Sequence, residues 1–397
     1  MRPLASRIAK MSGEGALSVY SRAKELEREG RSIIHLELGE PDFHPAPAVN
    51  EALKRAIDGG KDRYCPMVGV PALREAIADY LRRTRNLSVS PEQVVVAPGC
   101  KIILAMAMHA LIEPGDEILY PDPGFPAYSS VTRSLGGVCV PFELAEQNRL
   151  QPDPEEIVAR LTARSKVLIT NSPGNPTGTV YTEEVQRQLA ELAVKHDLWV
   201  LSDEIYARIL YGGGYVSMMG YPGMAERTVI IDGFSKSFAM TGWRLGYAVA
   251  PPEVVRALEM LVVNSYTCVA EFSQYGAIEA LTGSTNATER MVTEFARRRE
   301  QFVGDLNRVP GFRCISPQGA FYAWVNVSDT GLSAEEVCRL MLEEAGVAAI
   351  PGAAFGPAGK QFVRFSFASS TATLRDAVER IQQVSAAWQT ACQGKAR

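Results

Sequence analysis

Apolar residues occur along the middle of the chain in short continuous runs, and these alternate with stretches that repeat apolar positions every three or four residues. Short apolar runs bounded by turn residues are typical of buried strands, and the longer spacing is typical of amphipathic helices. The runs predict strands at residues 93–97, 117–120, 166–170, 199–202, 228–232 and 245–250. Helices are predicted at 101–111, at 183–196 after the N-cap Thr182, and at 252–263. This alternation indicates an α/β architecture in which helices cover a parallel sheet.

The pattern changes after about residue 284. It predicts a long charged helix at 288–307, strands near 312–315, 321–327 and 362–367, and further helices at 334–345 and 373–388. This mixture indicates a smaller α+β domain. We therefore expect an N-terminal arm at 1–45 that completes the small domain, a large domain at 46–285, and a small C-terminal domain at 286–397.

Composition and charge narrow the classes of function. The chain has 397 residues, enough for about two or three domains, and 41 basic against 45 acidic residues give a net charge of −4. Nothing in this balance favours nucleic-acid binding. Residues 1–7 lack the apolar core of a secretory signal, and the apolar run 102–112 contains His109 and is too short to span a membrane. We expect a cytoplasmic protein without a nucleic-acid or membrane partner.

The cysteines and glycines carry no cofactor signature of their own. The seven cysteines are scattered, with no Cys-x-x-Cys pair and no histidine at metal-ligand spacing, so we interpret them as reduced thiols and expect no metal. No Gly-x-Gly-x-x-Gly loop follows a predicted strand, and the sequence has no phosphate-binding P-loop.

Lys236 is the residue with the most chemical information. It follows the apolar run 228–232, small residues flank it, and Arg244 comes eight positions later. Burial and a neighbouring cation both disfavour the ammonium form of a lysine. The sequence therefore predicts a reactive amine at this position, available as a nucleophile near neutral pH.

The run Gly233 to Gly246, GFSKSFAMTGWRLG, resembles the lysine-attachment signature of the class I/II aminotransferases, which are fold type I enzymes dependent on pyridoxal 5'-phosphate. The resemblance extends from about Ser18 to Ser370. It implies a large domain with a mostly parallel sheet flanked by helices, plus a smaller α+β domain. It also implies that Lys236 holds the cofactor aldehyde as a Schiff base, and that the enzyme moves an amino group between an L-amino acid and a 2-oxo acid.

The cofactor phosphate requires donors. The predicted strand 93–97 runs through Gly99, Cys100 and Lys101 into a helix, so unpaired backbone N–H groups converge at the positive end of that helix. Arg244 offers a guanidinium fork for two phosphate oxygens. With Ser235, beside the lysine, these residues form the predicted phosphate end of the site.

The cofactor ring makes three further demands. Asp203 ends an apolar strand, where a buried carboxylate needs a cation, and the protonated ring nitrogen is one. Tyr206 and Asn175 match the family residues that bond the phenolic oxygen, and Asn175-Pro176 is a candidate cis bond. Phe125 matches the aromatic residue that stacks on the ring.

Three more matches concern the substrate and a partner subunit. By the resemblance, Arg364 grips the substrate α-carboxylate, and Gly39 lies near that carboxylate. Tyr64 resembles the tyrosine that crosses a dimer interface to the other subunit's phosphate. The N-terminal arm, with its amphipathic segment at 18–29, is expected to reach the same subunit, so the resemblance implies a homodimer with shared sites.

Two departures leave the substrate open. Gly233 stands where some relatives carry a serine, so one phosphate contact is absent. For a second substrate carboxylate, the polar position on the helix after Gly99 is His109, which is not permanently charged, and residues 264–268 contain no arginine. Aspartate specificity is therefore in doubt. The alternatives are another fold type I reaction, such as a C–S β-lyase or a synthase, and the aminotransferase-like ligand-binding domain of a transcription regulator.

Overall fold

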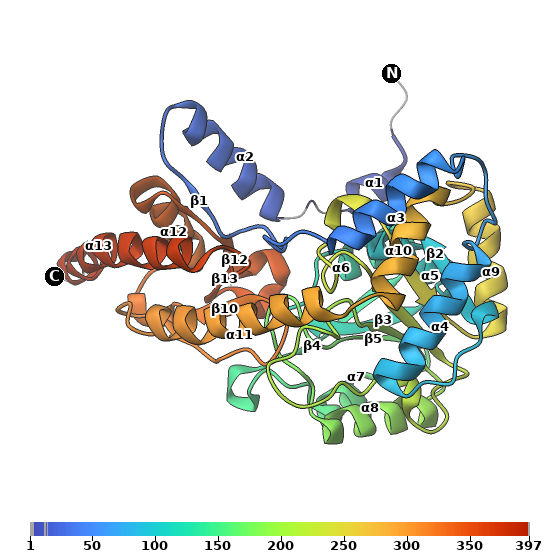
Figure 1. The fold of residues 1–397 in the computed structure, drawn as a ribbon. Helices are drawn as coiled ribbons and strands as arrows, with labels where there is room; N and C mark the ends of the chain where they lie inside the picture. The colour runs from blue at the N-terminus through green and yellow to red at the C-terminus, as the bar shows by residue number, and fades with distance from the viewer. Residues whose placement is uncertain (1–3, 12, 14, 396–397) are drawn as a thin grey trace.

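The computed structural model describes residues 4–11, 13 and 15–395. Its centre is a seven-stranded sheet in the order β2-β8-β7-β6-β5-β3-β4 (Figure 1). The strands are β2 (Val94–Ala97), β3 (Glu117–Asp122), β4 (Val138–Glu143), β5 (Ser165–Asn171), β6 (Trp199–Asp203), β7 (Thr228–Gly233) and β8 (Gly246–Val249). Six of them follow the predicted apolar runs. Only β4 was missed, although its residues 138–142 are apolar; this edge strand is exposed or half-buried at all but one position.

The sheet is mostly parallel, as expected, and one strand runs against the others. β3 pairs in parallel with β4 and β5, and β5, β6 and β7 continue in parallel. β8 instead runs antiparallel to both β7 and β2. An antiparallel neighbour needs no helical crossover, and the loop 234–245 provides the return without one. This loop carries Lys236.

Helices cover both faces of the sheet (Figure 1). On one face, α5 (Cys100–Leu111), α6 (Ala127–Ser134) and α9 (Pro252–Val263) close a continuous apolar core. The other face packs against α4 (Pro71–Arg85), α10 (Glu271–Thr282) and α8 (Glu183–Lys195). Thr182 caps α8 as predicted, because its hydroxyl accepts a bond from the Val185 amide at 3.2 Å. The remaining helices here are α3 (Pro47–Asp58) and α7 (Pro154–Arg160).

A second, four-stranded sheet lies beside the first and has the order β12-β13-β10-β9. Its strands are β9 (Arg313–Cys314), β10 (Tyr322–Asn326), β12 (Ile350–Pro351) and β13 (Phe362–Ser366), all antiparallel. The helices of this part are α11 (Asn286–Leu306), α12 (Ala334–Leu340), which continues as a π-helical turn to Ala345, and α13 (Thr371–Lys395). These elements follow the predicted pattern closely.

The N-terminal segment joins this second part. β1 (Ile34–His35) pairs in parallel with β11 (Val347–Ala348), and the Ser366 amide bonds to the Leu36 carbonyl at 2.7 Å. The preceding helices are α1 (Ser6–Ala9) and α2 (Gly15–Arg28), and α2 packs near β11 and β12 (Figure 1). Within the described part of the chain, no helix combines the length and the apolar character that a membrane crossing requires.

Candidate active site

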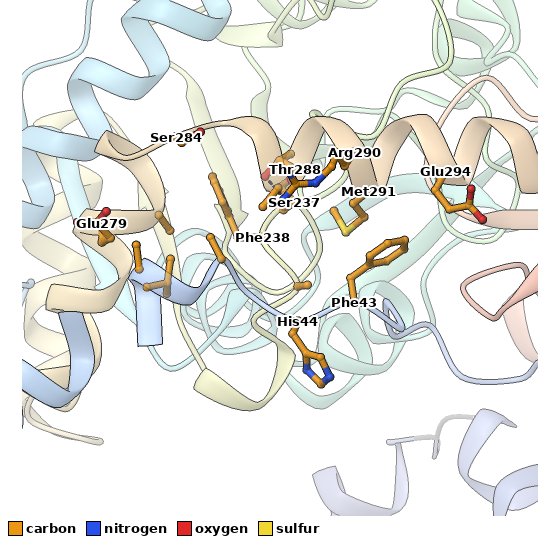
Figure 2. A pocket seen from close by; sticks show the side chains of 16 residues that line it. Phe43, His44, Ser237, Phe238, Glu279, Ser284, Thr288, Arg290, Met291 and Glu294 are labelled. Carbon is orange, nitrogen blue, oxygen red and sulfur yellow. Dashed lines mark hydrogen bonds between the residues drawn. The ribbon is translucent and has the colours of Figure 1, made fainter. Parts of the chain in front are cut away.

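Two cavities of similar size adjoin the loop that follows β7. One, of about 370 Å³, lies among α3, α10 and α11, with Phe43, Phe238 and Met291 in its wall (Figure 2). It contains none of the residues predicted to hold cofactor or substrate. The other, of about 330 Å³, opens at the carboxyl ends of the parallel strands, where α/β folds place their ligands. We call it the carboxyl-edge cavity.

The structure brings most of the predicted site residues together in the carboxyl-edge cavity. Its wall includes Gly39, Cys100, Lys101, Phe125, Asn175, Asp203, Tyr206, Ser235, Lys236, Arg244 and Arg364. Gly99 and Tyr64 lie outside this wall. Gly99 directly supports one of its members, as described below, and the Tyr64 side chain is 87% exposed on the surface.

Lys236 lies at the centre of the cavity wall, half-buried, on the loop after β7. Its Nζ donates a hydrogen bond to the Gly39 carbonyl oxygen, and no described carboxylate forms an ion pair with it. Burial lowers the pKa of Lys236 to about 8, and the nearby guanidinium groups of Arg364 and Arg244 also lower it. A minor fraction of this amine is therefore neutral at pH 7, and the fraction grows as the pH approaches 8.

Asp203 ends β6 and faces the same cavity. Its Oδ2 accepts a hydrogen bond from the Tyr128 hydroxyl at 2.7 Å, and among the described residues no cation pairs with it. Burial raises the pKa of Asp203 to about 6, although the bonds from Tyr128 and the Ile205 amide partly oppose the shift. A carboxylate held by a phenol in this way suits a cationic ligand atom. Tyr128 was not predicted, because one aromatic residue in an amphipathic helix is more often core.

The phosphate end is formed by the start of α5 and by Arg244. Gly99 has φ +95°, and a Cβ at this position would lie 2.5 Å from Nη2 of Arg244. Only glycine therefore lets the guanidinium approach the turn from which the first amides of α5 emerge. Arg244 also donates to the Thr241 carbonyl at 2.9 Å. This corner combines helix amides with a fixed cation, which suits a dianionic phosphate.

The residues expected around a cofactor ring form a connected polar set. The backbone N–H of Asn175 donates a hydrogen bond to Oδ1 of Asn171 at 2.8 Å. The Asn175-Pro176 bond is cis, as predicted. The Tyr206 hydroxyl lies 2.8 Å from that of Tyr322, a residue the sequence did not single out. Phe125 packs edge-on against Tyr128 with ring centres 5.7 Å apart. A flat apolar ring and two hydroxyls thus line one wall.

Arg364 comes from the second sheet, where it pairs with Trp324 across β10 and β13. It is 4% exposed; Nη1 donates to Oδ1 of Asn175 at 2.9 Å, and Nη2 donates to the Glu37 carbonyl. Its guanidinium also stacks on the Tyr322 ring at 4.5 Å. These contacts fix the fork at the cavity wall, where it suits a carboxylate ligand.

The sequence left the role of His109 open, and the structure places it away from the cavity. His109 is exposed near the far end of α5 and does not line the carboxyl-edge cavity. Nearly three helical turns separate it from Gly99, which carries it away from the site. Lys101, in the first turn of α5, does line the cavity, and its Nζ lies 5.5 Å from the centre of the Phe125 ring. The cavity wall thus holds the side-chain cation Lys101, which the sequence analysis had placed at the phosphate end.

No group of three or more histidine, cysteine, aspartate or glutamate side chains suited to a metal occurs among the described residues. The six cysteines whose side chains the structure describes are free thiols, and Cys392 lies outside that set.

The comparisons with known proteins identify the class. The architecture matches the solved structure of aspartate aminotransferase from Thermus thermophilus with maleate, with a TM-score of 0.92 and 39% identity over 97% of this chain and 100% of that one. This likeness defines a fold type I enzyme. The family described as aminotransferase class I and II matches residues 31–381.

Two curated relatives agree with this match. The aspartate/prephenate aminotransferase of Thermus thermophilus is 39% identical over 97% of this chain and 99% of its own length. The aspartate aminotransferase of Geobacillus stearothermophilus is 38% identical over 96% of this chain and 98% of its own length. The chain belongs to the class I and II aminotransferases. It is a pyridoxal 5'-phosphate-dependent transaminase that moves an amino group between an L-amino acid and a 2-oxo acid.

The residues present fit this cofactor. The corner at Gly99 and Arg244 suits its phosphate, and Asp203, which has a phenol but no described cation beside it, suits a protonated ring nitrogen. Lys236 is the amine within the same cavity. When bound, pyridoxal 5'-phosphate supplies an aldehyde that accepts amino groups and a cationic ring that takes up electrons as the substrate loses its α-proton.

Proposed function

We propose that this enzyme is an aspartate-type aminotransferase whose preferred substrates carry two carboxylates. The observation that carries the proposal is the presence of two side-chain cations, the buried Arg364 and the exposed Lys101, in one cavity wall together with the amine of Lys236. They come from different elements, β13 and α5. A substrate carboxylate at each would hold the α-carbon between them. The curated relatives named for aspartate agree with this choice.

The roles of the side chains follow from their chemistry. Arg364 binds the α-carboxylate through its fork, and Gly39 leaves space beside it, because a Cβ there would lie 2.1 Å from the Tyr322 hydroxyl oxygen. Lys236, neutral in part near pH 7, removes the α-proton and returns a proton as general base and acid. Asp203 keeps the ring nitrogen charged, while Tyr206 and Asn175 orient the ring. Cys100, Ser235 and Arg244 surround its phosphate end, whereas Lys101, which the sequence analysis placed at that end, is assigned here to the second carboxylate of the substrate.

We also propose a cytoplasmic homodimer. Tyr64 and Met67 are 87% and 37% exposed, and Met260 and Val263 are 63% and 41% exposed, which is unusual for large apolar side chains. The Cys65 thiol, next to Tyr64, bonds at 3.3 Å to the carbonyl of Val269, which lies six residues after Val263. A second copy covering this patch would bring Tyr64 to its partner's phosphate. Sedimentation of the holoenzyme tests the dimer directly, and a monomer at micromolar concentration would contradict it.

The substrate proposal is tested by an amino-donor screen with 2-oxoglutarate, oxaloacetate and pyruvate as acceptors. Aspartate and glutamate should have the highest kcat/KM. Lys101→Met should lower kcat/KM for these two by roughly 10- to 100-fold, the range for a lost charged hydrogen bond, and leave alanine nearly unchanged. Arg364→Lys should weaken all donors alike. Equal losses for aspartate and alanine in Lys101→Met, or pyruvate and ammonia released without an acceptor, would contradict the proposal.

A further inference from the structure

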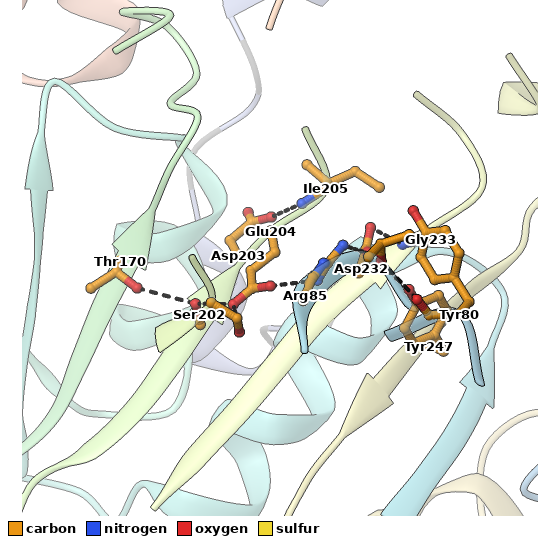
Figure 3. Close-up of polar contacts among 12 residues, drawn as sticks. Tyr80, Arg85, Thr170, Ser202, Asp203, Glu204, Ile205, Asp232, Gly233 and Tyr247 are labelled. Atoms are coloured by element: carbon orange, nitrogen blue, oxygen red, sulfur yellow. Dashed lines mark hydrogen bonds and ion pairs between the residues drawn. The ribbon is translucent and has the colours of Figure 1, made fainter. Parts of the chain in front are cut away.

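A buried ionic cluster lies directly behind Asp203, on the face of the main sheet that α4 covers (Figure 3). Arg85, the last residue of α4, donates from Nη1 to the Glu204 carboxylate and from Nη2 to the Asp232 carboxylate. The three side chains are 2%, 0% and 3% exposed. Glu204 follows Asp203 in the chain. Asp232 follows Ile231, the residue that pairs with Asp203 across β6 and β7.

The cluster is complete in its hydrogen bonds. Glu204 Oε1 accepts from the hydroxyls of Ser202 at 2.9 Å and Ser217 at 2.6 Å. Asp232 accepts from the Tyr247 hydroxyl at 2.8 Å and from the Gly233 amide at 2.6 Å. Each carboxylate oxygen therefore has a donor, which is the condition under which buried charges persist. The bond to Gly233 also fixes the start of the loop that carries Lys236.

The cluster is not neutral. Two carboxylates share one guanidinium, so one negative charge remains when both acids are ionised. Neighbouring strands lie about 4.8 Å apart, which puts this charge within strong electrostatic reach of Asp203 in a dry environment. Burial is the first cause of the raised pKa of Asp203, and Asp232 and Glu204 raise it further.

Other titratable groups also face Asp203. Those with which it interacts are Cys100, Tyr128, Tyr206, Tyr215, Glu204 and Asp232. Lys236 and Arg244 line the same cavity. The three phenols and the Cys100 thiol carry no charge at neutral pH, because burial raises the pKa of each above its ordinary value. Burial also raises the pKa of Glu204, and Arg85 with the two serine hydroxyls opposes that shift. Among the described acids that act on Asp203, Glu204 and Asp232 are therefore the two whose ionisation adds negative charge.

We propose that Glu204 and Asp232, held by Arg85, are positioning residues of the transamination, and that their excess negative charge strengthens the grip of Asp203 on the proton of the cofactor's ring nitrogen. The inference rests on the role proposed above for Asp203. The cluster touches neither substrate nor cofactor and acts only through that side chain. It also ties the ends of β6 and β7 together, so Asp203 and the Lys236 loop keep a fixed relation.

The test measures pyridoxal 5'-phosphate binding to the cofactor-free full-length protein between pH 5 and 8. Binding of a cationic ring requires ionised Asp203, so affinity should rise with pH around 6 in the wild type. Glu204→Gln and Asp232→Asn each remove the excess charge while keeping shape. Each should move this midpoint down by about one pH unit, as expected for the loss of one nearby like charge. The exposed acid variant Glu183→Gln should not move it.

Further variants distinguish the effect of the cluster's charge from its structural effect, and they test the role of Asp203 separately. Arg85→Met combined with Glu204→Gln keeps one acid and no cation, so its midpoint should return toward the wild-type value. Asp203→Asn should abolish the pH dependence near 6. If Asp203→Asn retains that dependence, the proposed role of Asp203 fails. If Asp203→Asn abolishes it but Glu204→Gln and Asp232→Asn leave the midpoint unmoved, the cluster is structural only and the inference is overturned.

Discussion

Two adjacent acids at the end of β6 have opposite surroundings. Glu204 lies on one face of the sheet, and Arg85 and two serine hydroxyls satisfy its carboxylate. Asp203 lies on the other face, where its carboxylate accepts a hydrogen bond from the Tyr128 phenol and, among the described residues, pairs with no cation. The fold thus supplies a cationic partner for the carboxylate of Glu204 and none, among the described residues, for that of Asp203. A buried carboxylate left without a cation destabilises the fold, so its persistence marks a place where a ligand supplies the missing charge.

The same contrast applies to cations. Arg85 is enclosed by carboxylates on the closed side of the sheet, whereas Lys236 on the open side bonds only to a backbone carbonyl. The closed groups hold strand ends in place, and the open groups perform chemistry at those ends. Each prediction below compares a change on the open side with a matched change on the closed side.

The largest effects should come from the two cations. Lys236→Ala should lower turnover by at least about 10⁴-fold, because it removes both the attachment point and the general base. Its thermal midpoint should stay near the wild-type value, since the side chain makes one described hydrogen bond.

Arg85→Ala should instead cost roughly 3–5 kcal/mol of stability, because two buried acids lose their cation. Assays of amino transfer and thermal denaturation on both variants check this. A stable Arg85→Ala protein, or an active Lys236→Ala protein, would break the comparison.

A smaller effect should follow from removing one phenol. Tyr128→Phe deletes the hydrogen bond to Asp203, worth about 1.5–3 kcal/mol for a charged acceptor. Since that bond lowers the pKa of Asp203, the pKa should rise, and cofactor affinity should fall by roughly 10-fold at pH 6 and less at pH 8. The control is Tyr247→Phe, which deletes a phenol bond to Asp232 on the closed side. It should lower the thermal midpoint more than it changes cofactor affinity. Similar affinity losses in both variants would contradict the contrast.

Much of this architecture could be predicted from the hydrophobic pattern of the sequence. Strands such as β7 are buried at every position, so their continuous apolar runs could be recognised. The direction of a strand could not be predicted, because an apolar run shows the same pattern in the antiparallel β8 as in the parallel strands of the sheet. β4 was overlooked, although its residues 138–142 form an apolar run like those of the recognised strands. Lys236 could be found because its neighbours form a recognisable run, not because of any property of a single lysine.

The residues that sequence reasoning missed depend on three-dimensional contacts. Arg85 closes a helix whose last turn also holds Arg82 and Arg83, a pattern that the helix dipole alone explains. Nothing in the chain indicates that Arg85 points inward between two acids 119 and 147 positions away. Lys101 and His109 share one helix, and only the helix phase relative to the cavity shows which of them enters it. The cofactor roles assigned to the cavity residues stay predictions until the variants are measured.

The smallest effect concerns Asp122, a buried acid that has neither a described cation nor a place in the cavity wall. Its carboxylate accepts the Ala358 amide at 3.2 Å, and burial raises its pKa to about 6, helped by Glu143. A raised folded-state pKa stabilises the fold below about pH 4 and costs stability as pH rises through 6. Asp122→Asn should therefore be more stable than wild type at pH 8 by about 1–2 kcal/mol and lose this advantage at pH 4.

The matched control for Asp122 is Asp116, which has a cation. Burial would raise the pKa of Asp116, but the bond from Lys166 at 2.8 Å and the Glu113 amide outweigh it, so the pKa is lowered. Asp116→Asn should then lose a little stability at pH 8, within about 1 kcal/mol for a partly exposed pair. Denaturation of both variants at pH 4 and 8 measures the two signs. If both substitutions destabilise the protein at pH 8, a missing cation does not mark a costly acid, and the reasoning that singles out Asp203 loses its physical basis.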